Sequence, residues 1–175
     1  MEADQVSSRL AALGRRLYRR RGWVGAAGYA VVLLFSAASV RSVLLSLPLA
    51  VVGMALRVWA AAYIGPIARG REIAVDRRVV GGAYHWFRHP LYVGNTFLVV
   101  AVLLALRPPA WVTVLVLVGY VFEYWTIARE EERALAGRQP LEATFSLCQA
   151  AAEWHTLAAV AAAYALGLLK AALWA

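Results

Sequence analysis

Residues 43–64 read VLLSLPLAVVGMALRVWAAAYI, an apolar run interrupted by one charged residue, Arg57. A helix needs about 20 predominantly apolar residues to cross the hydrocarbon core of a bilayer. This run is therefore long enough to form a transmembrane helix. Similar apolar runs predict four further spans, at residues 23–40, 91–106, 110–128 and 156–174.

The composition of the whole chain agrees with this interpretation. Of its 175 residues 62% are hydrophobic and only 16% are charged, whereas a soluble domain carries about 25% charged residues. Disorder is excluded as well, because disordered chains combine low hydrophobicity with high charge. Five spans use about 100 residues, which leaves room for one membrane domain. The only cysteine, Cys148, excludes an internal disulfide and a cysteine-rich metal site.

The first 22 residues differ from the rest of the chain in being strongly charged. Val6, Leu10, Leu13 and Leu17 recur at helical spacing, and arginines fill the other faces. This pattern predicts a helix lying on an anionic membrane surface. The predicted fold is thus all-α: residues 1–22 form a basic amphipathic interfacial helix, and residues 23–175 form a polytopic bundle of about five transmembrane helices.

The net charge of +8 could suggest nucleic acid, but its distribution indicates a role in topology. Arginines gather in the N-terminal arm and in residues 65–90 and 129–139, which fall on the same side if the spans alternate. The positive-inside rule predicts that this side is cytoplasmic, in an integral protein of the cytoplasmic membrane that has membrane lipids as partners. Nucleic acid is therefore not an expected partner.

The loop before the third predicted span carries the most distinctive motif. Residues 81–95 read GGAYHWFRHPLYVGN. Gly81 and Gly82 permit a tight turn, and Pro90 suits the first turn of a helix. Arg88 and His89 precede that helix, whose free N–H groups and dipole attract anions. The segment is suited to hold a carboxylate, although an aromatic interface belt would explain part of it.

A second charged segment follows the fourth predicted span, where Glu130, Glu131 and Glu132 come in sequence. Acidic residues at a helix C-terminus oppose the helix dipole. Glu131 shares a helical face with Tyr124 and Ile127, so we expect it to point back towards the bundle. The alternative is a solvated helix end paired with nearby arginines.

Two charges lie inside predicted spans, Arg57 and Glu123. Charges are costly in the membrane and suggest a function by default. For Arg57 the alternatives are an interhelical pair with a carboxylate such as Glu123, snorkelling to the interface, or direct contact with a substrate. Glu123 is expected to be an interface residue without a catalytic role.

Taken together, these segments resemble the isoprenylcysteine carboxyl methyltransferase family, which is related to the phospholipid N-methyltransferases. The resemblance rests on Arg-His-Pro-x-Tyr at residues 88–92, on the preceding Gly-x-Tyr turn, and on the glutamates at 131–132. Residues 56–65, which read LRVWAAAYIG, are also similar to the preceding helix of the family. The resemblance covers residues 56–135, about half of the chain.

The resemblance implies an integral-membrane methyltransferase that uses S-adenosylmethionine and needs no metal or covalent nucleophile. The site would be built from segments 77–95 and 123–135. The implied cofactor-binding residues are Arg78, Val79, Gly82, Tyr84, His89, Pro90, Tyr92, Glu131 and Glu132. The basic residues Arg88 and Arg129 are the implied catalytic residues.

Two departures from the family concern the methyl acceptor. The family often has an arginine one turn before the cofactor-binding glutamate, and this chain has Ile127 there. Residues 136–155 also differ from the tail of the family. The resemblance implies a lipophilic acceptor (a small molecule, lipid or prenylated thiol) and favours isoprenylcysteine-type carboxyl O-methylation. N- or S-methylation, a non-catalytic membrane protein with this fold, and a nicotinamide-dependent membrane reductase remain alternatives.

Overall fold

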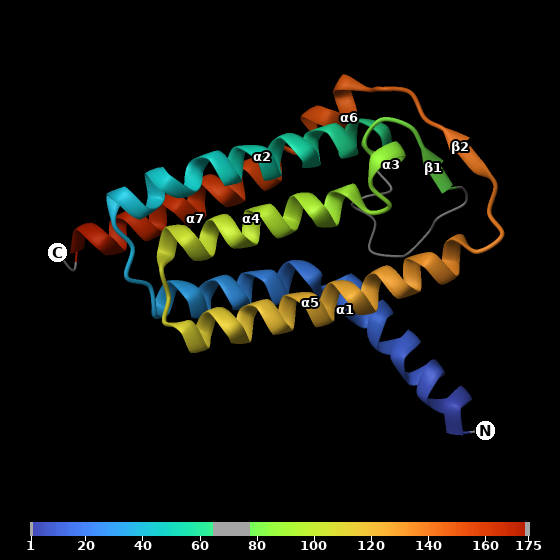
Figure 1. The fold of residues 1–175 in the computed structure, drawn as a ribbon, viewed down its shortest axis with the longest axis horizontal. Coiled ribbons are helices and arrows are strands. Elements are labelled where there is room, and N and C mark those ends of the chain that lie inside the picture. The colour runs from blue at the N-terminus through green and yellow to red at the C-terminus, as the bar shows by residue number, and fades with distance from the viewer. Residues whose placement is uncertain (1, 65–77, 174–175) are drawn as a thin grey trace.

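The computed structural model describes residues 2–64 and 78–173 and shows an all-α bundle (Figure 1). Its long helices agree in number with the predicted spans. They are α1 (Glu2–Leu34), α2 (Val40–Ile64), α4 (Pro90–Leu106), α5 (Ala110–Leu135) and α7 (Trp154–Leu173). The short elements are β1 (Arg78–Val80), α3 (Ala83–Trp86), β2 (Pro140–Glu142) and α6 (Leu147–Ala151). Arg69, Arg71 and Arg77, which the charge argument used, lie outside the described residues.

Three segments of the described chain are long and apolar enough to cross a membrane: Val40–Ile64, Ala110–Leu135 and Leu147–Leu173. Helix α4 is apolar but shorter, as the sequence predicts. Large apolar side chains point outward, including Leu45 on α2, Val118 on α5 and Leu169 on α7, each more than half exposed. A soluble protein would bury such faces, whereas lipid accepts them. The prediction of an all-α membrane bundle is confirmed.

Helix α1 continues without a break across the predicted boundary at residue 22 and ends at Leu34. The prediction of a span that continues to residue 40 is therefore wrong, because α2 already begins at Val40. Ser39 explains the difference, because its hydroxyl accepts a hydrogen bond from the Ser42 backbone N–H at 3.1 Å. This is the geometry of a helix N-cap, so α2 begins immediately after Ser39.

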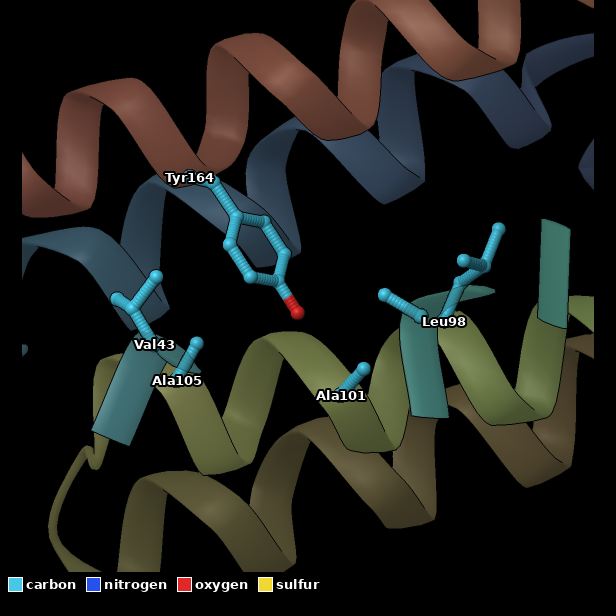
Figure 2. Packing of buried hydrophobic residues seen from close by; sticks show 6 residues of the cluster. Val43, Leu98, Ala101, Ala105 and Tyr164 are labelled. Atoms are coloured by element: carbon cyan, nitrogen blue, oxygen red, sulfur yellow. The ribbon is translucent and has the colours of Figure 1, made fainter. Parts of the chain in front are cut away.

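Helices α2 and α4 pack closely because small residues line their interface. A methyl group at Gly94 would lie 2.9 Å from the carbonyl oxygen of Gly53, and one at Gly53 would lie 2.9 Å from that of Gly94. Small residues at a crossing allow membrane helices to approach each other closely. Helix α7 adds Tyr164, which extends towards Ala101 and Ala105 of α4 in Figure 2.

A two-stranded parallel pair forms where no strand was predicted. Arg78, Val79 and Val80 of β1 pair in register with Pro140, Leu141 and Glu142 of β2. The pair joins the segment before the glycine turn to the tail that differs from the family. In Figure 1 both strands lie with α3, α6 and the C-terminal ends of α2 and α5 at one end of the bundle. The described basic segments therefore share this end.

Candidate functional site

A cavity of about 580 Å³ lies at this end of the bundle. Its volume is within the range of roughly 300–1,000 Å³ that is usual for small-molecule sites. Residues from the long helices and from β1 and α3 form its walls. The lining residues are Tyr18, Arg21, Arg57, Ile64, Arg78, Val79, Val80, Tyr84, Arg88, His89, Pro90, Leu91, Tyr92, Asn95, Tyr124, Glu131, Glu132, Leu135, His155 and Thr156.

Most of the predicted site residues lie together on this cavity, although they come from two separate segments. Those that line it are Arg78, Val79, Tyr84, Arg88, His89, Pro90, Tyr92, Glu131 and Glu132. The structure does not bring Gly82 or Arg129 to the lining.

Gly82 and Arg129 have other surroundings. Gly82 has φ +51°, and a methyl group there would collide with the ring of Tyr63. Its lack of a side chain thus lets the turn pack against α2. Arg129 is exposed, and its guanidinium carbon lies 5.3 Å from the centre of the Trp125 ring. It faces away from the cavity because residues two apart on a helix, such as 129 and 131, point in different directions.

Glu132 links the two segments through ion pairs. Its carboxylate accepts hydrogen bonds from Arg88 Nε at 2.7 Å and Nη2 at 2.6 Å, which is a bidentate arrangement. It also accepts a bond from Arg78 Nη2 at 2.9 Å and lies 3.1 Å from His89 Nε2. Each pair is partly exposed, so its individual contribution to stability is small. Together the pairs fix the loop against the end of α5.

Glu131 is held by the first residues of α4. The Tyr92 hydroxyl donates a hydrogen bond to Glu131 Oε1, and His89 Nδ1 lies 3.5 Å from Oε2. The His89 and Tyr92 rings stack, with centroids 5.4 Å apart. Glu131 therefore faces the cavity, as its spacing from Tyr124 predicts, and its side chain stays partly accessible. A carboxylate held in this way can accept hydrogen bonds from a ligand.

Tyr84 supplies a polar group that the described chain leaves without a partner. Its hydroxyl is buried, and no described residue forms a hydrogen bond with it. Burial, followed by the nearby Glu131 carboxylate, raises the pKa of Tyr84 above its usual value. The hydroxyl therefore stays protonated and can donate to a bound molecule. A buried polar group without a partner is costly, and a ligand in the cavity would satisfy it.

Arg57 marks the inner end of the cavity, but its carboxylate partner is not the one predicted. Its Nε donates to Glu153 Oε2 at 3.0 Å, while Nη1 donates to Asn95 Oδ1 and Nη2 to Thr156 Oγ1. Glu123, which the sequence suggested as the partner of Arg57, is instead a buried residue of α5. Glu153 reaches Arg57 because α6 and α7 pack on α2, which the sequence alone could not show.

Sequence reasoning gave no role to several lining residues, some of them within the two predicted segments. Asn95 and Tyr124 meet in the interior, where Asn95 Nδ2 donates to the Tyr124 hydroxyl at 2.5 Å. A polar amide within an apolar run was a signal that could have identified Asn95. Four other lining residues come from α1 and α7, and no local pattern marks them. They are Tyr18, Arg21, His155 and Thr156.

Comparison with known proteins connects this geometry to a family. The model of the isoprenylcysteine carboxyl methyltransferase (ICMT) family matches residues 44–137, which is more than half of the chain. The match spans α2, α4, α5 and the loop that carries the motif, and it ends before β2. Searches of curated proteins and of solved structures found no match.

Proposed function

The chain belongs to the isoprenylcysteine carboxyl methyltransferase family, and on this premise we propose that it is an S-adenosylmethionine-dependent enzyme that methylates a lipophilic acceptor. The family and the apolar helices make it an integral membrane protein of a methyltransferase family. Carboxyl O-methylation of an isoprenylcysteine-type acceptor is the reaction we expect first. The observation that carries the proposal is the cavity shared by Tyr84, His89 and Glu131.

The residues at the outer end of the cavity fit the polar groups of the cofactor. The Glu131 carboxylate can accept hydrogen bonds from an ammonium or from ribose hydroxyls, and the partnerless Tyr84 hydroxyl can donate one. His89 and the positive end of the α4 dipole can hold a carboxylate. Arg78, Val79 and Pro90 complete the wall. Glu132 is expected to support the site by holding Arg88 and Arg78.

When bound, the cofactor would supply a methyl group on a sulfonium sulfur, and the acceptor atom would bond to this methyl carbon as the carbon–sulfur bond breaks and the thioether leaves. The protein needs to position the reactants and exclude water, and both effects accelerate such a step. A carboxylate acceptor is already deprotonated and needs no general base. Arg88, predicted to be catalytic, is bound to Glu132 at the cavity wall, where we expect it to shape the site.

The acceptor is expected to lie at the inner end of the cavity, deeper in the bundle. Asn95 and Tyr124 lie about two helical turns from the outer residues His89 and Glu131, which is roughly 10 Å along the helix axes. Arg57 has five N–H donors, and four meet Glu153, Asn95 and Thr156. The remaining donor can bind an oxygen of the acceptor.

A second candidate, N- or S-methylation of a lipid or small molecule, is supported by Ile127. This residue stands where the family often has an arginine, and it is fully buried. Without that charge, an acceptor that lacks a carboxylate is also plausible for the cavity. In either case we expect the basic end of the bundle to face the cytoplasm, with membrane lipids and no nucleic acid as partners.

The proposal is tested with membranes that contain the overexpressed protein and S-adenosylmethionine labelled in its methyl group. We expect label in a lipid-phase product. Loss of label on base treatment indicates a methyl ester, and retained label indicates an N- or S-methyl product. The His89→Ala variant should reduce labelling strongly. Labelling no greater than in membranes without the protein would refute the proposal.

A further inference from the structure

The segment beyond the family match contributes a buried carboxylate that contacts Arg57, a residue that lines the cavity. Glu153 lies between α6 and α7, and its side chain is only 2% exposed. It lies well beyond the family match, which ends at residue 137. Figure 1 shows α6 and the start of α7 beside the C-terminal end of α2, where Arg57 lies.

Glu153 contacts two nitrogens of the Arg57 guanidinium. Its Oε2 lies 3.0 Å from Nε and 2.9 Å from Nη2. The Arg57 side chain is 14% exposed, so both charges are shielded from bulk solvent. A buried arginine that loses its carboxylate partner keeps an uncompensated charge. The pair therefore determines both the orientation of the guanidinium and its charge balance.

The other contacts of Arg57 leave one edge of the guanidinium for the cavity. Asn95 accepts from Nη1 and Thr156 accepts from Nη2. The stem of Arg57 is fixed as well, because a methyl group at Gly94 would lie only 2.7 Å from its Cγ. With Nε and Nη2 held by Glu153, the second N–H of Nη1 is the donor that no described residue accepts from, and Arg57 lines the cavity.

We propose that Glu153 is a positioning residue that holds Arg57 so that its remaining Nη1 donor binds an oxygen of the acceptor. This inference rests on the proposed function and deepens it, because it gives the C-terminal segment a part in acceptor binding. Glu153 itself does not line the cavity and acts through Arg57. At the outer end, Glu131 is held by His89 and Tyr92.

The first test separates acceptor binding from cofactor binding in the Glu153→Gln variant. S-adenosylmethionine affinity is measured by titration calorimetry, and methyl transfer is measured with a farnesylated N-acetylcysteine and with phosphatidylethanolamine vesicles. We expect cofactor Kd within about twofold of the native value and the acceptor KM raised about tenfold or more, since a charge-assisted bond is lost. Glu153→Asp should recover part of the loss. The matched control is Glu142→Gln, an exposed position on β2.

The second test exchanges the charges, in the variant Arg57→Glu with Glu153→Arg. If the pair only joins helices, the exchange restores both stability and methyl transfer. If Glu153 positions Arg57, the exchange restores cofactor binding and thermal stability but not the acceptor KM, because the guanidinium then extends from position 153, before α7, and not from α2.

Several outcomes would overturn the inference. These are an unchanged acceptor KM in Glu153→Gln, a parallel loss of cofactor and acceptor binding, and full recovery of transfer in the exchanged variant. Native protein that binds the cofactor but methylates neither acceptor would also overturn it. Native protein that binds no S-adenosylmethionine would instead refute the proposed function.

Discussion

Replacing Gly94 by alanine is expected to destabilise the bundle, although alanine is the better helix former. The added methyl group would lie 2.7 Å from Arg57 Cγ, 2.9 Å from the Gly53 carbonyl oxygen and 3.3 Å from the Arg57 backbone nitrogen. Two of these atoms belong to the backbone of α2 and cannot move without moving the helix. The substitution must therefore separate α2 from α4 or displace the side chain of Arg57.

The expected magnitude follows from these contacts. Overpacking a close interface costs about 1–3 kcal/mol, and the higher helix propensity of alanine offsets about 0.5–1 kcal/mol of it. The net loss of about 1–2 kcal/mol corresponds to a fall in Tm of roughly 2–8 °C for a chain of this size. If the added methyl group displaces the side chain of Arg57, the acceptor KM should rise as well.

The assay is thermal unfolding of the purified protein in detergent, with Gly119→Ala as the matched control. Gly119 also lies within a long helix, but a methyl group there would meet no other atom of the described chain within 4 Å. The control should unfold at the native Tm or slightly above it. A Gly94→Ala protein as stable as the control would refute the close approach of α2 and α4.

Three further substitutions test the outer end of the cavity. Glu132→Gln should weaken S-adenosylmethionine binding about tenfold at most, because the ion pairs that it removes are partly exposed; calorimetry that finds no change would contradict a supporting role. Tyr92→Phe keeps the ring but removes the hydrogen bond to Glu131, so cofactor Kd should rise about 5- to 20-fold in the same titration. Gly82→Ala should lower Tm by several degrees, since the methyl group meets the Tyr63 ring at a positive φ, and an unchanged unfolding curve would exclude that contact.

The sequence predicted the parts of the fold that depend on local pattern. Apolar runs identify spans because a helix must satisfy its own backbone in lipid. The sequence analysis missed the end of α1 because the apolar run continues past it. Ser39, the N-cap of α2, lies within that run, and hydropathy alone does not distinguish it from the residues around it. The β1–β2 pair was missed because three-residue strands have no periodicity to detect.

The candidate site was predictable where residue order carries the chemistry. Arg88 and His89 lie directly before α4, which begins at Pro90, and the spacing of Glu131 from Tyr124 indicates a shared face. The partner of Arg57 was not predictable, because Glu153 meets it only after α7 packs against α2. Pairing between distant helices depends on tertiary packing. The sequence contains several carboxylates, and nothing in it shows which of them becomes the partner of Arg57.

The central claim is that the cavity bordered by Glu131 binds S-adenosylmethionine, and calorimetric titration of purified native protein tests it most directly. The native protein and the control Glu142→Gln should bind with the same affinity, while Glu131→Gln should bind at least about tenfold more weakly, because a ligand loses a charged acceptor. Absence of binding to the native protein, or equal affinity in all three proteins, would contradict the account.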